Sequence, residues 1–321
     1  MIYMFHLGKI GNPKVYIFII NPAAGHGKAK RVFEALTNSK PYQQINSIYY
    51  YTRYEGHAEI IAEQIASKYR QTKKLQAVIV IGGDGTFHEV VNGIASANIP
   101  LGFIPGGSGN DFARGACIKG RPEEILQRII QSDSSKTYWL GQYAVENKEM
   151  RCFVNSIGFG FDAEIAQNAN QSLYKKGLNA FRFGSLSYIF ALIKVLFFFK
   201  PFTVTIEIDG KVREIERCWM VSVANHPFYG GGMKVIPTAK IQPNVLPLII
   251  IHGVSKWKIL GLFLTVFTGK HTQFKEVELL ESHKVKITST EPLYYQVDGS
   301  TNTCLTSLIM KKAHSIQIKG T

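Results

Sequence analysis

The stretch that most constrains the fold of this chain is residues 77–94, AVIVIGGDGTFHEVVNGI. Its first five residues form an apolar run rich in β-branched side chains, which is typical of a strand buried on both faces in a parallel sheet. Glycines follow at once. Apolar residues then recur at helical spacing from Phe87 to Ile94, with Thr86 positioned as the helix N-cap. The stretch therefore predicts a strand, a tight turn and a helix.

The glycine-rich turn within this stretch indicates a phosphate-binding loop. Glycine has no Cβ, so a phosphate can approach the backbone, and the unpaired N–H groups at the start of the helix attract an anion. The alternative is a hairpin turn at Asp84 and Gly85, which are a favoured turn pair. The helical spacing after the turn argues against a second strand, and hence against that alternative.

Three other segments repeat the order of strand, loop and helix. They have strand-like runs at 14–20, 48–51 and 101–104, followed by loops at 21–27, 52–56 and 105–114. The first run is too short for the apolar part of a secretory signal and is interpreted as a strand. Four such units in succession predict an α/β fold with a parallel sheet. Its loops gather at the carboxyl ends of the strands, where ligands bind in such folds.

The second half of the chain has a different periodicity. After a helix predicted for residues 121–130, residues 202–208 alternate in polarity, and Asp209-Gly210 signals a hairpin into residues 211–217. Further strands are predicted at 152–157, 219–224, 248–252, 284–289, 294–297 and 315–319. A chain of 321 residues exceeds one ordinary core, so two domains are predicted, the second mainly antiparallel β with helices.

Basic residues exceed acidic ones, with 37 Lys and Arg against 23 Asp and Glu and a formal net charge of +14. This balance favours an anionic partner, such as a nucleotide, a nucleic acid or an anionic membrane. No nucleic-acid motif stands out, so no nucleic acid is expected as a partner. The cysteines are too widely spaced for a CxxC-type metal site, which favours a reduced, cytoplasmic protein. They are Cys117, Cys152, Cys218 and Cys304.

Two segments of the second half, residues 186–202 and 259–267, are unusually apolar. Neither has the ~20 uninterrupted apolar residues of a membrane-spanning helix. One interpretation is that both helices bury their apolar faces against the β domain. The other is that part of one helix lies at a lipid surface, held by its flanking basic residues Lys256, Lys258 and Lys270. Both interpretations stay open.

Several motifs occur in a fixed order along the chain. They are NPAAG at residues 21–25, Thr52 with Gly56-His57-Ala58, GGDGT at 82–86, GGSGNDFAR at 106–114, GGGMKVIPTAKI near 230 and QVDG near 297. This set resembles the bacterial diacylglycerol kinase-like lipid kinases, which are related to the eukaryotic diacylglycerol, sphingosine and ceramide kinases. GGDGT alone is also similar to the NAD kinases, distant relatives, but GGSGNDFAR fits the lipid kinases better.

The resemblance implies a domain plan and an activity. It implies an ATP-binding α/β domain over residues 1–138, joined by a last strand at about 306–321, and a C-terminal β-sandwich over residues 139–305. It further implies transfer of the γ-phosphate of ATP, with Mg²⁺, to a hydroxyl of a lipid. The protein would then be cytoplasmic and peripherally associated with an anionic membrane. Pairing of two copies through sheet edges is a further expectation.

The phosphate loops carry the residues that the resemblance places near ATP. Asp84 is the only acid in the central loop and is expected to reach Mg²⁺ or the acceptor hydroxyl, although its alternative role is turn chemistry. His57 and His88 are interpreted as helix-surface residues rather than acid–base groups. The expected ATP-binding residues are Asn21, Pro22, Ala23, Ala24, Gly25, Thr52, Gly82, Gly83, Asp84, Gly85, Thr86, Phe87, His88, Glu89, Gly107, Ser108 and Asn110, with Ser108 in place of a usual threonine.

The sequence departs from the family pattern at three acids. The family has a DDGLLD-like run that helps to hold a structural Mg²⁺, whereas the stretch from Gln242 to Pro247 has no carboxylate, so that metal site is expected to be lost. The family motif DGE, with Glu as general base, here reads Asp298, Gly299 and Ser300. A third family acid aligns loosely with Trp139.

These departures leave three hypotheses for the activity. A positioned base contributes ~10² to 10⁴ in rate, and positioning and charge stabilisation carry most of phosphoryl transfer, so losing Glu need not abolish turnover. We favour a kinase acting on a lipid alcohol other than ordinary diacylglycerol, with Asp84 or Asp298 doing the remaining work. The second hypothesis is a catalytically impaired ATP-binding member with a regulatory or binding role. The third is an NAD kinase-like enzyme with a soluble acceptor.

Overall fold

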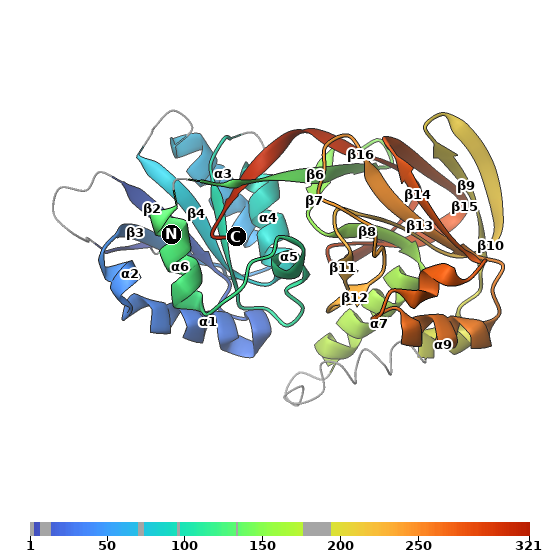
Figure 1. The fold of residues 1–321 in the computed structure, drawn as a ribbon, viewed down its shortest axis with the longest axis horizontal. Helices are drawn as coiled ribbons and strands as arrows, with labels where there is room; N and C mark the ends of the chain where they lie inside the picture. The colour runs from blue at the N-terminus through green and yellow to red at the C-terminus, as the bar shows by residue number, and fades with distance from the viewer. Residues whose placement is uncertain (1–2, 7–13, 70–73, 95–96, 133, 176–193) are drawn as a thin grey trace. The chain divides into compact units, whose positions relative to one another are not determined.

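The computed structural model describes residues 3–6, 14–69, 74–94, 97–132, 134–175 and 194–321 (Figure 1). Residue contacts divide the chain into two compact units: unit 1 contains Met1–Trp139 and His314–Thr321, and unit 2 contains Leu140–Ala313. The chain leaves unit 1 within strand β6 (Lys136–Val145) and returns within strand β16 (Ser300–Lys319). The return falls at His314, where about residue 306 was expected, because β16 is one long strand that serves both units.

Unit 1 contains the predicted parallel sheet. Its four central strands are β2 (Val15–Ile20), β3 (Asn46–Tyr51), β4 (Leu75–Gly82) and β5 (Leu101–Pro105). They lie in the order β3-β2-β4-β5 and pair in parallel throughout. Side chains of the inner strands, such as Ile17 and Val80, are fully buried, as expected for strands covered on both faces. The predicted α/β architecture is confirmed.

Two further strands extend this sheet. β1 (Tyr3–His6) pairs antiparallel with β3, so the short amino-terminal extension supplies an edge strand that no sequence pattern indicated. At the other edge, Ile318 and Lys319 of β16 pair in parallel with Leu101 and Gly102 of β5. The predicted strand at 315–319 is therefore the end of β16.

The helices of unit 1 lie on both faces of the sheet (Figure 1). They are α1 (Ala24–Thr37), α2 (Lys40–Gln43), α3 (His57–Tyr69), α4 (Asp84–Ile94), α5 (Asp111–Gly115) and α6 (Pro122–Gln131). α1, α2 and α6 contact one another, whereas α3 contacts α4. Right-handed crossovers place α1 on one face and α3 and α4 on the other, because the chain moves in opposite directions after β2 and after β4.

Helix α4 begins three residues earlier than predicted, at Asp84 rather than at Phe87. The prediction that Thr86 is its N-cap is therefore wrong. Thr86 lies in the first turn and is buried, because its hydroxyl accepts a hydrogen bond from Asn21 Nδ2 (3.0 Å) and its side chain packs against Gly82. The Thr86 hydroxyl therefore bonds to Asn21, 65 positions away in the sequence, instead of capping the helix locally.

Unit 2 is built mainly from antiparallel strands, as the alternation predicted. β9 (Phe202–Ile208) turns at Asp209 (φ 48°) and Gly210 (φ 83°) into β10 (Lys211–Ala224), which confirms the hairpin. The other strands are β7 (Arg151–Phe153), β8 (Ser156–Gly160), β11 (Phe228–Tyr229), β12 (Met233–Lys234), β13 (Leu246–His252), β14 (Val277–Ser282) and β15 (Lys284–Val297). β9 pairs with both β10 and β15, and β8 does the same, so these four strands close on themselves.

Three strand predictions differ from the structure. Residues 152–157 are divided between β7 and β8, because the intervening amides donate to the carboxylate of Asp298 rather than to a strand. Residues 211–224 form one strand with an irregularity between Ile215 and Cys218. Residues 284–297 likewise form one strand with an irregularity between Thr288 and Leu293.

Unit 2 has two apolar cores that share strand β13. Leu248 and Ile250 belong to a core between strands, whereas Ile249 and Ile251 pack under the helices α7 (Phe161–Lys175) and α9 (Lys256–Thr265). Successive side chains of a strand point to opposite faces, so a continuous apolar run serves both cores.

The structure describes only part of the two apolar segments, residues 186–202 and 259–267. Residues 186–193 lie outside the described residues, and residues 194–198 are helical. The segment predicted at 259–267 is α9, which begins at Lys256 and ends at Thr265. Among the described residues, no helix is long and apolar enough to cross a membrane.

Candidate functional site

Three loops of unit 1 meet at the carboxyl ends of β2, β4 and β5. The amide of Asn21 donates to the carbonyl of Ile81 (3.0 Å), and the amide of Gly106 donates to the carbonyl of Gly82 (2.8 Å). Both neighbouring loops are thereby tied to the central strand. The winding direction of the sheet changes between β2 and β4, which is the point where open α/β sheets bind ligands.

Glycines allow these loops to touch backbone to backbone. A Cβ on Gly25 would lie 2.3 Å from the carbonyl oxygen of Gly106, and a Cβ on Gly107 would lie 2.5 Å from the Cα of Gly83. Any side chain at Gly25 or Gly107 would push the loops apart. The loops therefore form one cradle of backbone groups, which suits a triphosphate better than three separate turns would.

The loop after β2 turns sharply before helix α1 becomes regular. Asn21 Oδ1 accepts a hydrogen bond from the amide of Ala23 (3.1 Å) across Pro22, and Ala24 is the first residue of α1. Gly25, His26 and Gly27 then have left-handed φ values of 57°, 55° and 81°. This conformation costs an ordinary residue roughly 1–2 kcal/mol, so glycine is favoured at two of the three positions.

The carboxylate of Asp84 joins the second loop to the third. Its Oδ2 accepts a hydrogen bond from the amide of Asp111 (3.1 Å), and its Oδ1 accepts one from the amide of Phe112 (2.8 Å). Through these two hydrogen bonds, Asp84 holds the loop after β5 in position.

Three residues of helix α4 that were expected near ATP have structural contacts. Phe87 is fully buried and stacks on Phe112 with 4.0 Å between ring centroids, so it is a core residue. His88 is only 8% exposed, which corrects its interpretation as a helix-surface residue. The carboxylate of Glu89 accepts a hydrogen bond from the amide of Ala58 (3.0 Å) at the start of α3, and burial raises its pKa.

The other expected residues border the cradle. Thr52 is buried and its amide donates to the carbonyl of Ile20 (2.8 Å), whereas Ser108 is exposed. The side chain of Asn110 accepts from the amide of Gly107 (3.0 Å) and donates to its carbonyl (2.9 Å), which fixes the third loop. Gly85 lies in α4 with open space where its Cβ would be.

Metal ligands are sparse in the part of the chain that the structure describes. That part contains no group of three or more His, Cys, Asp or Glu side chains that could hold a metal ion. The loop from Gln242 to Pro247, before and into β13, has no carboxylate. Mg²⁺ in nucleotide sites is usually bound by one or two carboxylates together with the phosphates, so Asp84 fits that limited role.

The expected catalytic position Asp298 has a clear structural function in unit 2. Its carboxylate accepts hydrogen bonds from the amides of Val154 (2.8 Å), Asn155 (2.8 Å) and Ser156 (3.1 Å). These bonds hold the turn between β7 and β8. Ser300, at the position of the family's glutamate, is exposed at the start of β16.

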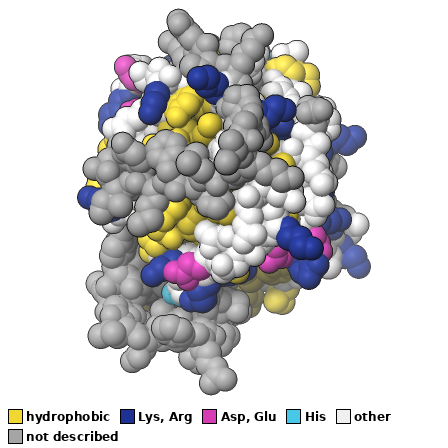
Figure 2. Space-filling view, turned by 90° about the vertical axis from the view of Figure 1, so that its left-hand side faces the viewer, with side chains coloured by type: hydrophobic (Ala, Val, Ile, Leu, Met, Phe, Trp, Pro, Cys, Tyr) yellow, Lys and Arg dark blue, Asp and Glu magenta, His cyan; other side chains and the backbone are white. Residues whose placement is uncertain are grey.

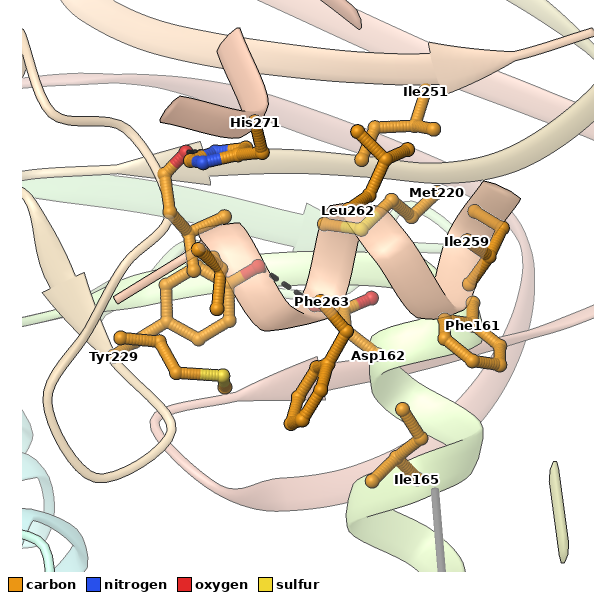
Figure 3. A pocket seen from close by; sticks show the side chains of 13 residues that line it. Phe161, Asp162, Ile165, Met220, Tyr229, Ile251, Ile259, Leu262, Phe263 and His271 are labelled. Carbon is orange, nitrogen blue, oxygen red and sulfur yellow. Dashed lines mark hydrogen bonds between the residues drawn. The ribbon is translucent and has the colours of Figure 1, made fainter. Parts of the chain in front are cut away.

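Unit 2 also contains an apolar pocket that the sequence analysis did not predict (Figure 3). Its volume is about 70 Å³, and helices α7 and α9 and strands β10 and β13 contribute to its walls. A single water needs roughly 10–15 Å³ by this measure, so the pocket has room for several small groups. Its polar residues are Asp162, Tyr229 and His271, and the side chains around them include Phe161, Met220, Ile259, Leu262 and Phe263.

Asp162 is the most unusual group in this pocket. Its Oδ2 accepts hydrogen bonds from Ser222 Oγ (3.0 Å) and, more weakly, from the Tyr229 hydroxyl (3.4 Å), as Figure 3 shows for Tyr229. Its Oδ1 is buried and has no hydrogen-bond partner of ordinary geometry among the described residues, although the amide of Ala163 and the side chain of Gln296 lie close enough to oppose the rise of its pKa. Burial raises the pKa of Asp162 to about 6. An unpaired buried oxygen is costly, so the site calls for a hydrogen-bond donor.

His271 adds a second free acceptor to the same pocket. Its Nε2 donates to the carbonyl of Val235 (2.9 Å), and burial lowers its pKa, which favours the neutral ring, in which Nδ1 is an acceptor. Among the described residues, this buried Nδ1 has no partner. The pocket therefore combines an apolar wall with two acceptors that a hydroxyl could satisfy.

The sequence carried a weak signal for this site. In SIGFGFDAEI, residues 156–165, Asp162 follows an almost wholly apolar strand and lies in the first turn of a helix. A Cβ on Gly158 would lie 1.9 Å from Asp162 Oδ2, so this glycine makes room for the buried carboxylate. The pattern alone could not show that one oxygen lacks a partner.

We expect Asp162→Asn to alter the pH dependence of stability. The pKa of Asp162 is about 6 in the folded chain against an ordinary 3.8, so the folded state holds the proton more tightly and stability falls as pH rises through this window. The loss is on the order of 3 kcal/mol, which the uncharged Asn would escape. Urea unfolding of both proteins from pH 4 to 8 tests this, and parallel curves would contradict it. Buried His226, whose pKa is lowered to about 4, changes the unfolding free energy with pH in the opposite direction. Because both proteins contain His226, its contribution cancels when the unfolding free energy of the variant is subtracted from that of the parent at each pH.

Comparison with known proteins places the chain in a family. The family described as "Diacylglycerol kinase catalytic domain" matches residues 15–140, and that described as "YegS C-terminal NAD kinase beta sandwich-like domain" matches residues 155–316. The chain is 33% identical over 289 residues to "Putative lipid kinase YtlR" of Bacillus subtilis (strain 168), covering 88% of this chain and 92% of that protein. It is 25% identical over 269 residues to "Diacylglycerol kinase" of Mycobacterium tuberculosis (strain CDC 1551 / Oshkosh), covering 84% and 83%.

The fold is also shared with a solved structure. A crystal structure of a diacylglycerol kinase from Bacillus anthracis str. Sterne matches with a TM-score of 0.68 and 21% identity, covering 97% of each chain. The expected α/β domain and C-terminal β-sandwich are confirmed by the two family matches. This chain belongs to the diacylglycerol kinase-like family of lipid kinases.

Proposed function

We propose that this protein is an ATP-dependent kinase that transfers the γ-phosphate to a hydroxyl of a lipid alcohol other than ordinary diacylglycerol. The observation that carries the proposal is the buried, unpaired Oδ1 of Asp162 in an apolar pocket. A lipid alcohol supplies both a hydroxyl donor and a hydrocarbon body. The relatives named as a putative lipid kinase and a diacylglycerol kinase support a lipid kinase, and the departure at Ser300 supports a changed acceptor.

The residues of unit 1 would bind ATP. Backbone groups around Gly25, Gly83 and Gly107 would contact the phosphates, because a side chain at these positions is sterically excluded or would block their approach. Asp84 would have one of two roles: it would hold Mg²⁺, which would screen the phosphate charge, or it would accept the proton of the acceptor hydroxyl. The acceptor oxygen would bond to the γ-phosphorus as the bond to the β–γ bridging oxygen breaks, and the hydroxyl proton would pass to a base, which is Asp84 in the second of these roles.

A second function has one observation in its favour. Asp298 is engaged by three backbone amides, and Ser300 cannot replace a glutamate base, so an ATP-binding member with impaired catalysis is the main alternative. An NAD kinase-like enzyme with a soluble acceptor is the third candidate, favoured by GGDGT alone.

A labelling experiment separates these functions. We expect transfer of labelled γ-phosphate from ATP with Mg²⁺ to a lipid in a mixed-micelle panel of diacylglycerols, other long-chain alcohols and lipid extracts. Asp162→Ala should raise the KM for the lipid at least tenfold with little change in the KM for ATP, because it removes the acceptor of the hydroxyl hydrogen bond. ATP binding without any product would favour the impaired member. Phosphorylation of NAD without micelles would favour the third candidate.

A further inference from the structure

Helix α9 is apolar on two opposite sides. One side, with Ile259, Leu262 and Phe263, lines the pocket. The other side carries Trp257 and Leu264, which are seven residues apart and so share a face, and which are 74% and 70% exposed. A helix that is apolar all round is normally covered on every side by protein or lipid. The outer side of α9 is therefore unusual, because its large apolar side chains are exposed to solvent.

The apolar surface continues from α9 onto a neighbouring segment. The rings of Phe197 and Trp257 are in edge contact with 6.4 Å between centroids, and Lys256 Nζ donates to the carbonyl of Phe197 (2.6 Å). We call the exposed residues Phe197, Phe198, Trp257, Leu264 and Phe267 the aromatic face. They are five of the eleven large exposed hydrophobic residues among the described residues. Such gathering marks an interaction surface, whereas single exposed hydrophobic residues are ordinary.

The exposed charges around the aromatic face are mainly positive, and the neighbouring Glu276 is neutralised by Lys258. Residues 194–202 and 253–275 contain six lysines and no Asp or Glu. Lys258 forms an ion pair with Glu276 (2.7 Å), so its charge is neutralised and it does not count toward a lipid-binding surface. On the face shown in Figure 2, basic side chains also occur beside acidic ones. The exposed lysines are Lys194, Lys200, Lys256, Lys270 and Lys275.

Exposed apolar side chains surrounded by lysines favour one kind of binding partner for this face. Two copies of the aromatic face would bring five lysines against five lysines, so self-association through this face is opposed by repulsion. A membrane surface with anionic headgroups satisfies both features, because aromatic and aliphatic side chains enter the acyl boundary while lysines reach the phosphates.

We infer that the aromatic face docks this protein on an anionic membrane surface. Because the inner side of α9 lines the pocket, docking would bring the acceptor lipid to the pocket wall directly from the bilayer. Only this last step rests on the proposed function. Docking itself requires neither ATP nor transfer.

The test is binding to vesicles of phosphatidylcholine with and without phosphatidylglycerol, measured by sedimentation in the absence of ATP. The parent should bind only the anionic vesicles and be released by high salt. Trp257→Ser with Leu264→Ser should weaken the partition at least tenfold, and Lys200→Gln with Lys256→Gln should weaken it roughly fivefold for each lysine. The matched controls, Val212→Ser with Leu305→Ser and Lys211→Gln with Lys286→Gln, replace exposed residues of unit 2 elsewhere and should bind like the parent.

Fluorescence identifies the inserted residue. Trp257 is exposed whereas Trp219 is buried, so anionic vesicles should shift the emission of the parent to the blue. Trp257→Phe should keep binding but lose most of this shift. Unchanged melting temperatures would show that the variants fold.

The outcomes are distinct from those of the kinase assay. Parent-like binding by Trp257→Ser with Leu264→Ser, or no preference of the parent for anionic vesicles, would overturn the inference. Dimerisation that is lost in the same variant would assign the face to a second copy instead. If the parent binds vesicles as described but phosphorylates no lipid in micelles, the docking inference stands and the proposed function fails.

Discussion

Replacing Asp84 with asparagine is expected to lower phosphoryl transfer by at least ~10²-fold, because a charged group that serves proton transfer or cation binding is removed. The same change should lower stability by about 1–3 kcal/mol. One carboxylate oxygen becomes an NH₂ group facing a backbone amide of Asp111 or Phe112, which leaves that amide unpaired. Initial rates and thermal melts on the same samples measure both effects.

Asp111→Asn is the matched control for this prediction. It weakens the ion pair with Arg114 (2.8 Å) at the same loop but leaves the carboxylate of Asp84 intact. We expect a comparable loss of stability with a much smaller loss of transfer. Equal losses of transfer in both variants would mean that loop geometry, rather than the charge of Asp84, limits the reaction. Full activity of Asp84→Asn would remove Asp84 from the proposed chemistry.

Gly25→Ala is expected to weaken ATP binding at least tenfold. Its Cβ would lie 2.3 Å from the carbonyl oxygen of Gly106, so the loop after β2 must separate from the loop after β5, and the backbone cradle opens. The alanine must also adopt φ near +57°, which adds roughly 1–2 kcal/mol of strain. Calorimetric titration with ATP measures the loss of affinity.

Gly27→Ala separates strain from steric contact. Gly27 also has positive φ (81°), but its Cβ would meet only the end of the Arg31 side chain at 3.2 Å, which can move away. We expect this variant to lose stability like Gly25→Ala but to bind ATP nearly as the parent does. If both variants lose affinity equally, strain in the turn is the cause and the loop contact is not.

The proposed docking face, the proposed lipid acceptor and the phosphate loops could be predicted from the sequence to different degrees. The strand, loop and helix at residues 75–94 could be predicted because periodicity and glycine content are local properties. The Asp209-Gly210 hairpin was predictable for the same reason. The apolar character of α9 was also evident, but which of its sides is covered was not. Lys258 was one of three lysines that one of the two interpretations placed at a lipid surface, and its pairing with Glu276 became known only from the fold.

What the sequence alone determined is therefore the series of elements, the glycine loops and the family. What only the tertiary structure decided is which polar groups find partners. Asp84 is bound by amides 27 and 28 residues away, Asp298 by amides more than 140 residues away, and Asp162 by Ser222 and Tyr229. The physical reason is the sequence separation over which each kind of interaction acts. Helices, strands and turns are set by neighbours within a few residues, whereas burial and hydrogen-bond partners come from segments that meet only when the chain is folded.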